Sequence, residues 1–253
     1  MTTLSRVLIV PAAGLGSRLG ANVPKLFVPV AGVPMIDRIL DLYADRVSHV
    51  ALVVNPTFSL AVRRHLDSCS RPVAIDCIEQ RRPTGMLDAI LLALDSVRRN
   101  SPASVWITWC DQVAVQGLTV DKLSAATSRP PHPAIVMPTV FRDSPYIHFE
   151  RDGSGRIMRV LQRREGDPMP AQGESDIGLF ALSPLACNEL LPRYAAEVEA
   201  GGGTGERNFL PFIPWVARGH EVVTFSCSHP MEAVGVNTPE ELKAVEEYLQ
   251  RPA

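Results

Sequence analysis

The sequence lacks the cysteine pattern of a disulfide framework or of a structural zinc site. Its five cysteines are an odd number, and no two of them form a CxxC pair. Disulfides belong to oxidising compartments, whereas scattered single thiols are typical of reducing ones. We therefore expect a cytoplasmic protein without disulfide bonds.

An excess of charge and a long apolar run are also missing. The formal net charge is -2, so the composition gives no reason to expect nucleic acid or an anionic membrane as a partner. No apolar run approaches the roughly 20 residues of a membrane span. The short run "VLIV" near the N-terminus has no basic leader, and we interpret it as a first strand instead of a signal peptide. The oligomeric state stays open.

Three familiar functional patterns are absent as well. No Ser/His/Asp or Cys/His constellation for nucleophilic catalysis is recognisable in the sequence. A Walker A loop is excluded because no glycine precedes Lys25. A dinucleotide fingerprint fails twice: Leu19 stands at its third glycine position, and the second predicted strand ends at Asn55 in place of an acidic residue.

Short apolar segments alternate with amphipathic ones along the chain. The amphipathic segments Met35–Val47 and Thr84–Arg99 predict helices that pack against a sheet. This alternation predicts a mostly parallel, doubly wound sheet, and 253 residues with 46% hydrophobic content suffice for a sizeable core. The predicted strands are Arg6–Val10, Val50–Val54, Val73–Ile78, Val105–Thr108, Ala134–Met137, Ile157–Leu161, Ile177–Leu182 and Val222–Phe225.

The second half of the chain has a different character. From about Ser128 the predicted strands come closer together, and no internal repeat is recognisable. The glycine-rich segment Glu199–Glu206 is typical of a mobile loop and not of a domain linker. We expect a single domain over residues 1–253, with a nucleotide-binding half (about 1–128) and an acceptor-binding half (about 129–253).

The loop after the first predicted strand reads "PAAGLGSRLGANVPK". A strand that ends in glycines before a helix lets backbone N–H groups approach an anion, and the helix N-terminus favours negative charge. A tight turn with two surface cations would explain the same residues. If the loop binds phosphate, Arg18 and Lys25 place two positive charges beside it, which suits a triphosphate better than a dinucleotide.

The segment "PAAGLGSRLGANVPKLFVPVAGVPMIDRIL" (residues 11–40) closely resembles the signature of the sugar-1-phosphate nucleotidyltransferases. Further likenesses are "QRRPTGMLDAI", "VWITWCDQ", "DGSGRIMRVLQRREGD", "ESDIGLFAL" and "MEAVGVNTPEEL", which together extend over most of the chain. The pattern is most similar to the N-acetylglucosamine-1-phosphate uridyltransferase domain. The resemblance implies a Rossmann-like, doubly wound mixed α/β sheet of the GT-A-like nucleotidyltransferase type.

The reaction implied by this resemblance joins an NTP to a sugar 1-phosphate and releases pyrophosphate. A phosphate monoester is already anionic at neutral pH, so the attack on the α-phosphorus needs no general base. The resemblance assigns Arg18 to the β- and γ-phosphates and Lys25 to the α-phosphate and the incoming phosphate. Its implied metal ligands are Asp111 and Asn237, which would hold Mg²⁺ or Mn²⁺. The implied nucleotide-binding residues are Ala12, Ala13, Gly14, Gly16, Ser17, Gln80 and Gly85.

Several of these residues also have a purely structural interpretation. Asp111 fits a turn or a helix cap, and either Asn237 or Thr238 fits the cap of a helix that begins at Pro239. Gln80 is the preferred residue for reading a uracil or cytosine edge, because an amide both donates and accepts. Its register is open by one residue, so Arg81 is an alternative, although a solvent-exposed face explains Arg81 equally well.

The acceptor half departs from the family at several positions. The metal strand reads "CDQVA" where the family has G-D-x-P, and "SPYIHFE" stands where a glycine-containing "GYG" is expected. The family's sugar-binding glutamate and asparagine correspond to Gln162 and Asp176. We therefore expect the same reaction with an acceptor other than N-acetylglucosamine 1-phosphate, contacted by Tyr146, Gln162, Asp176 and Glu206.

Three other functions remain as alternatives. A cytidylyltransferase that acts on a polyol or phosphonate phosphate acceptor would use the same loop and fold. A non-catalytic domain that senses nucleotide sugars would keep the fold but not need Arg18, Lys25 and Asp111. A GT-A glycosyltransferase would need a DxD-type metal motif, which "WCDQ" does not supply.

Overall fold

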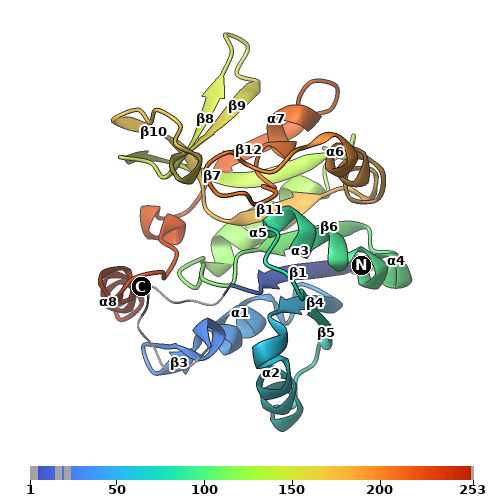
Figure 1. The fold of residues 1–253 in the computed structure, drawn as a ribbon, viewed down its shortest axis with the longest axis vertical. Helices are drawn as coiled ribbons and strands as arrows, with labels where there is room; N and C mark the ends of the chain where they lie inside the picture. Colours follow the sequence, from blue (N-terminus) through green and yellow to red (C-terminus); the bar gives the residue numbers. More distant parts are fainter. Residues whose placement is uncertain (1–4, 15–18, 20–23, 252–253) are drawn as a thin grey trace.

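A computed structural model describes residues 5–14, 19 and 24–251. The chain forms a single mixed α/β domain around an eight-stranded sheet with the order β10-β7-β11-β6-β1-β4-β5, and β12 pairs with β7 (Figure 1). The strands of this sheet are β1 (Arg6–Ala12), β4 (His49–Val54), β5 (Ala74–Glu79), β6 (Ser104–Thr108), β7 (Ile135–Asp143), β10 (Gln172–Asp176), β11 (Leu179–Leu182) and β12 (Val222–Ser226). Two small sheets pair β2 (Pro29–Val30) with β3 (Val33–Pro34) and β8 (Ile147–Arg151) with β9 (Ile157–Gln162).

The central strand β1 is buried along its whole length, because it lies between β4 and β6 and is parallel to both. Its side chains alternate between two cores, as a strand buried on both faces requires. Leu8 and Val10 belong to one hydrophobic cluster, while Val7 and Ile9 belong to the other. The sheet therefore separates two hydrophobic cores.

Helices cover both faces of the sheet, which confirms the predicted doubly wound architecture. The first core contains side chains from α1 (Met35–Tyr43), α2 (Pro56–Ser68), α5 (Gly117–Thr127) and α8 (Pro239–Leu249). The second core contains side chains from α3 (Met86–Leu92), α4 (Leu94–Asn100), α6 (Leu191–Glu197) and α7 (Phe212–Val216). Short 3₁₀ turns are η2 (Lys25–Phe27), η3 (Arg163–Glu165) and η5 (Pro230–Ala233), and a π-helical turn, η4 (Ala186–Leu190), precedes α6.

Two predicted elements have different bounds in the structure. The predicted helix Thr84–Arg99 is two helices, α3 and α4, which meet at Ala93. The predicted strand Ile177–Leu182 begins only at Leu179, because the chain turns through Gly178 at φ +69°. The sheet is mixed, as the family resemblance implies: it is parallel around β1 and antiparallel where β11 pairs with β6 and β7 and where β10 pairs with β7.

The glycine-rich segment Glu199–Glu206 is held in place by Glu165. The carboxylate of Glu165 accepts hydrogen bonds from the Gly203 amide at 2.9 Å and from the Thr204 hydroxyl at 2.5 Å. A Cβ at Gly203 would lie 2.6 Å from the Arg164 carbonyl oxygen. Glycine at position 203 therefore permits close packing of two backbones, and mobility of the segment stays a prediction.

No helix in the described part of the chain combines the length and the apolar character that a bilayer-spanning helix needs.

Candidate active site

The expected site residues follow the carboxyl ends of strands β1, β5 and β6. These strands are parallel members of one sheet, so their carboxyl ends lie along a single edge. Open α/β sheets bind ligands at this edge. Ala12 ends β1 and is followed by Ala13, Gln80 follows β5, and Asp111 lies three residues beyond the end of β6.

Three polar side chains from distant parts of the sequence meet near this edge. The Lys25 ammonium donates to Asp111 Oδ2 at 2.6 Å and to Asn237 Oδ1 at 2.8 Å. The side chains of Lys25 and Asp111 are only 12% and 15% exposed, so solvent screens this ion pair weakly. We call Lys25, Asp111 and Asn237 the cation cluster.

The backbone around Gly235 fixes the geometry of the cation cluster. The backbone N–H of Val236 donates to the Asp111 carbonyl oxygen at 3.1 Å, and the backbone N–H of Asn237 donates to Glu241 Oε2 at 2.8 Å. A Cβ at Gly235 would lie 3.2 Å from the Asp111 carboxyl carbon, so glycine lets the two segments approach closely. Asn237 does not cap α8: Thr238 accepts from Glu241 N and forms a capping box with Glu241.

The cation cluster provides the donor set that a divalent cation needs. A carboxylate oxygen and an amide oxygen converge on one positively charged atom, the Lys25 Nζ. Mg²⁺ prefers oxygen ligands and takes only one or two of them from protein, since phosphates and water complete its shell. The residues present therefore fit Mg²⁺ or Mn²⁺.

Two neighbouring groups influence the charge of this region. Loss of solvation raises the pKa of the Cys110 thiol to about 12, so it stays neutral beside Asp111. Burial raises the pKa of Asp176 to about 6, and the negative charge of Asp111 adds to that rise. Asp176 Oδ2 accepts from the Gly178 amide at 2.8 Å, which stabilises the turn between β10 and β11.

The expected base-binding residues lie together after β5. Gln80 is buried, and its Nε2 donates to the Gly85 carbonyl oxygen at 3.1 Å, whereas Arg81 is exposed. Gly85 adopts φ +118°, and a Cβ there would lie 2.5 Å from the Arg207 carbonyl oxygen. Close packing against the backbone of Arg207 therefore explains this glycine without a ligand.

The expected acceptor residues come from several segments of the second half. Tyr146 is 44% exposed and directly precedes Ile147, which pairs with Gln162 at one end of the β8–β9 hairpin. Glu206 lies beside Gly85, since a Cβ on that glycine would be 3.0 Å from Glu206 Cβ, and its carboxylate faces Arg164 at 3.6 Å. The tertiary fold thus brings Glu206 from the acceptor half next to a residue of the nucleotide half.

Gly14 is exposed beyond the end of β1, and three expected phosphate-binding residues, Gly16, Ser17 and Arg18, lie outside the described residues. Sequence reasoning missed Gln112 and Gly235, which lie directly against the cation cluster: a Cβ at Gly235 would be 3.2 Å from Gln112 Nε2 as well as from Asp111. The available signal was the glycine two positions before Asn237 in "MEAVGVN".

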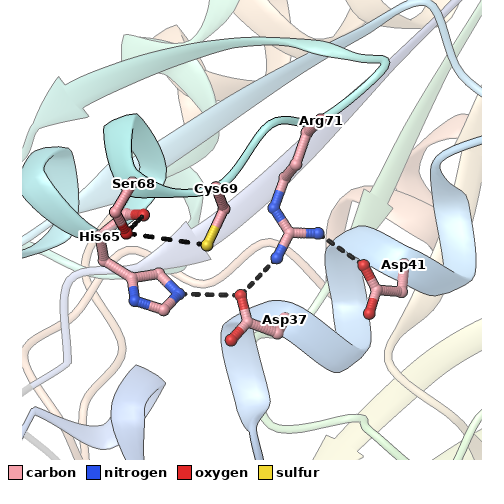
Figure 2. Close-up of polar contacts among 6 residues, drawn as sticks. All are labelled: Asp37, Asp41, His65, Ser68, Cys69 and Arg71. Carbon is pink, nitrogen blue, oxygen red and sulfur yellow. Dashed lines mark hydrogen bonds and ion pairs between the residues drawn. The ribbon is translucent and has the colours of Figure 1, made fainter.

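A second group of metal-ligand types lies between α1 and α2 and contains none of the expected site residues (Figure 2). Ligand atoms of Asp37, His65 and Cys69 lie within 4.8 Å of one another. However, Asp37 Oδ1 already binds the guanidinium of Arg71 and lies 2.8 Å from His65 Nε2, and Arg71 also binds Asp41. We therefore interpret Asp37, Asp41, His65 and Arg71 as the α1–α2 ion network, which joins two helices.

A hollow of about 690 Å³ lies between the hairpin and the sheet, and its lining includes His148, Arg151, Met158 and Glu174. None of the residues of the cation cluster lines it. Arg151 and Glu174 are paired there at 2.6 Å, so the charges in this hollow already satisfy each other. The cation cluster is therefore a better candidate for the chemistry than this hollow.

Comparisons with known proteins agree with the fold and with the nucleotidyltransferase family that the sequence resembles. Residues 8–176 match the family described as MobA-like NTP transferase domain. The chain is 24% identical over 250 residues to the bifunctional protein GlmU of Paraburkholderia xenovorans and 27% identical over 247 residues to that of Azoarcus sp., with 96% of this chain and 52% of each relative covered. The chain thus spans about half the length of these curated relatives.

The solved structure of HddC from Yersinia pseudotuberculosis has the same fold. It aligns with a TM-score of 0.69 at 16% identity over 96% of this chain and 99% of HddC. A second HddC structure, complexed with GMP-PN, aligns with a TM-score of 0.66 at 16% identity over the same shares of the two chains. The chain belongs to the MobA-like NTP transferase domain family and is a nucleotidyltransferase.

Proposed function

We propose that this enzyme transfers a nucleotidyl group from an NTP, with UTP favoured, to the phosphate of a sugar 1-phosphate-like acceptor and releases pyrophosphate. The observation that carries this proposal is the cation cluster, in which Lys25, Asp111 and Asn237 converge near the carboxyl edge of the sheet. The reaction needs positioned polyanions and neutralised charge, and it needs no protein nucleophile. The neutral thiol of Cys110 fits this requirement.

The phosphates of the NTP would lie over the loop that follows β1. Backbone groups of Ala12, Ala13, Gly14, Gly16 and Ser17 would approach the phosphate oxygens. The guanidinium of Arg18 would bind the β- and γ-phosphates and remain with the departing pyrophosphate. Lys25 would bind the α-phosphate and the incoming acceptor phosphate, so that the attacking oxygen lies in line with the leaving group.

Asp111 and Asn237 would hold Mg²⁺ or Mn²⁺. When bound, the metal ion supplies positive charge to the phosphate oxygens as charge develops at the α-phosphorus. The protein's part is to hold the two oxygen donors in place, which the Val236–Asp111 and Asn237–Glu241 hydrogen bonds do.

Gln80 is our candidate for recognition of the base. Its Nε2 donates one hydrogen bond to Gly85, which leaves the second N–H and the amide oxygen as the groups that would bind a pyrimidine edge. The acceptor would contact Tyr146, Gln162, Asp176 and Glu206. A cytidylyltransferase with a polyol phosphate acceptor is the second candidate, because Ile147 and Asp176 depart from the sugar-binding pattern.

Asp111→Asn tests this function directly. We expect pyrophosphate release, measured over a panel of NTPs including UTP, CTP and GTP with several sugar and polyol phosphates, to fall to background, because an amide holds a divalent cation more weakly than a carboxylate. EDTA should abolish the wild-type activity.

The matched control is Asp121→Asn, which removes a 61% exposed carboxylate on α5 and should leave the activity unchanged. Circular dichroism should show that both variants are folded. Full activity of folded Asp111→Asn, or of the wild type in EDTA, would contradict the proposed mechanism.

A further inference from the structure

The Lys25 ammonium lies between the two oxygen atoms that would bind the metal ion. Its Nζ is 2.6 Å from Asp111 Oδ2 and 2.8 Å from Asn237 Oδ1. We propose that Lys25 is an internal cation that closes the metal site, and that the phosphates of the nucleotide draw it out so that the metal ion enters. This inference rests on the proposed function, because it takes Asp111 and Asn237 as the metal ligands.

The ammonium and a divalent cation compete for the same oxygen atoms. Asp111 Oδ2 and Asn237 Oδ1 both accept hydrogen bonds from Lys25 Nζ, and the same two side chains would hold Mg²⁺, which takes oxygen ligands. Two positive charges beside the same two oxygens would also repel strongly in a partly buried site. The metal ion and Lys25 are alternative partners of the same two oxygens.

The surroundings of Asp111 explain why the site contains its own cation. The Asp111 side chain is only 15% exposed, and a buried carboxylate without a partner is costly. Asp176 contributes further negative charge nearby, as its interaction with Asp111 shows. Lys25 compensates this charge, and a divalent cation would do the same when Lys25 leaves.

The position of Lys25 in the chain makes its exchange possible. Lys25 begins η2, so it follows in sequence the segment that we assign to the phosphates, and bound phosphates would attract its side chain away from Asp111. A triphosphate offers several negative charges in place of one carboxylate and one amide. Nucleotide and metal ion would consequently bind with positive coupling, since each favours the same position of Lys25.

The first test measures Mn²⁺ binding to the nucleotide-free protein by electron paramagnetic resonance. We expect Lys25→Met to bind Mn²⁺ more tightly than the wild type by on the order of 10-fold or more, because the competing cation is gone. Lys243→Met is the matched control: it removes a 79% exposed lysine on α8, and the affinity should stay at the wild-type value. Asp111→Asn should abolish binding in both backgrounds. Equal Mn²⁺ affinity of Lys25→Met and wild type, including no binding by either, would overturn the proposal.

The second test follows the lysine itself. Amine acylation of the wild type, read by mass spectrometry of peptides, should show that Mg²⁺ increases the labelling of Lys25 and leaves Lys243 unchanged. If saturating Mg²⁺ left the labelling of Lys25 unchanged, the metal ion would not displace this lysine from Asp111. A higher Mn²⁺ affinity of Lys25→Met would then reflect only the loss of one positive charge near the site.

The outcome is independent of the test of the proposed function. If the wild type released pyrophosphate but Lys25→Met did not change the Mn²⁺ affinity, the proposed function would stand and the exchange of Lys25 for the metal ion would be refuted. Tighter Mn²⁺ binding without pyrophosphate release from any substrate pair would do the reverse.

Discussion

Asp176 shows how a single buried side chain links the site to stability. The carboxyl group is 8% exposed, lies at the end of β10 and interacts with Asp111. Desolvation is the largest cause of its raised pKa, and the Gly178 amide, which favours the ionised form, offsets it only in part. The folded protein therefore binds a proton at Asp176 more strongly than the unfolded chain does.

We predict that Asp176→Asn stabilises the protein at alkaline pH. A pKa of about 6, against an ordinary value of 3.8, means that the stabilising contribution of the neutral form is complete below about pH 3.8 and is lost as the pH rises through about 6. Asparagine is neutral at every pH and can still accept from Gly178. The free energy of unfolding at pH 8 should therefore rise by up to about 3 kcal/mol, with little gain at pH 4.

Urea unfolding of wild type and variant at both pH values measures this difference. Asp143→Asn, an exposed aspartate on the neighbouring strand β7, is the control and should show no such pH dependence. A gain that is equal at pH 4 and pH 8 would show that ionisation of Asp176 is not its cause.

At the scale of elements, the start of α3 depends on a segment from the other half of the chain. The Leu87 amide donates to the Arg207 carbonyl oxygen at 3.1 Å, and the Arg207 amide donates to the Thr84 carbonyl oxygen at 2.8 Å. Gly85 lies between these contacts in a conformation that side chains rarely adopt. This junction positions both Gln80, through its bond to Gly85, and Glu206.

Gly85→Ala should disrupt that junction. The new Cβ would meet the Arg207 backbone at 2.5 Å and would strain the backbone at φ +118°. We expect the free energy of unfolding to fall by at least about 2 kcal/mol, as for other clashes combined with an unfavourable φ.

Gly219→Ala is the control, because a Cβ there has no neighbour within 4 Å, and its change should stay within about 0.5 kcal/mol. Chemical denaturation measures both variants. If Gly85→Ala were as stable as the wild type, the segment around Arg207 would be able to move away from the start of α3 at no cost.

The α1–α2 ion network is a second junction between elements. Asp37 is 15% exposed and binds both Arg71 and His65, whereas Asp41 is 68% exposed and binds Arg71 alone. Asp37→Asn should therefore lower the free energy of unfolding by about 1–3 kcal/mol, because it leaves partly buried donors with a weaker acceptor.

Asp41→Asn should cost less than about 1 kcal/mol, as is typical of exposed ion pairs. Thermal and urea unfolding of the two variants in parallel would measure the contrast. Equal losses in the two variants would indicate that burial does not distinguish the two carboxylates.

At the scale of the whole molecule, the two halves of the chain contribute to one sheet and one site. β11 pairs with β6, and the segment around Asn237 returns to Asp111. The nucleotide-binding positions keep the family pattern, while Ile147, Gln162 and Asp176 in the second half depart from it. We therefore expect the molecule to combine nucleotidyl transfer with an acceptor other than N-acetylglucosamine 1-phosphate.

We predict poor use of N-acetylglucosamine 1-phosphate. Ile147 adds bulk where the family's glycine would open the backbone. Gln162 replaces the family's glutamate and Asp176 its asparagine, so the hydrogen-bond donors and acceptors offered to sugar hydroxyls differ. Each unmatched buried polar group costs about 1–3 kcal/mol. Another sugar, cyclitol or polyol phosphate should be preferred by at least about 10-fold in kcat/KM, which corresponds to about 1.4 kcal/mol.

Steady-state kinetics with matched acceptors and a single NTP would measure this preference. If N-acetylglucosamine 1-phosphate proved the best acceptor, our interpretation of Ile147, Gln162 and Asp176 would be wrong, while nucleotidyl transfer itself would stand.

Local sequence patterns determined the architecture of this protein. The strands β1, β4 and β6 are runs of β-branched and apolar residues, and α1 carries its apolar side chains at helical spacing, so periodicity located them. Periodicity did not locate strands β8 and β10, since "IHFER" and "QGESD" carry little apolar signal. The ordered motifs from Pro11 to Leu40 indicated the nucleotidyltransferase family, and the phosphate loop that they imply stays a prediction.

Only the tertiary structure decided which polar residues meet. Lys25, Asp111 and Asn237 are separated by 86 and 126 positions in the chain, and their contact depends on how β6, η2 and the segment before α8 reach the same place. The same is true of Gly85 and Arg207, and of Glu165 and the glycine-rich loop. Propensity and periodicity act over a few residues, whereas a carboxylate finds its partner only when packing of the whole sheet has brought distant segments together.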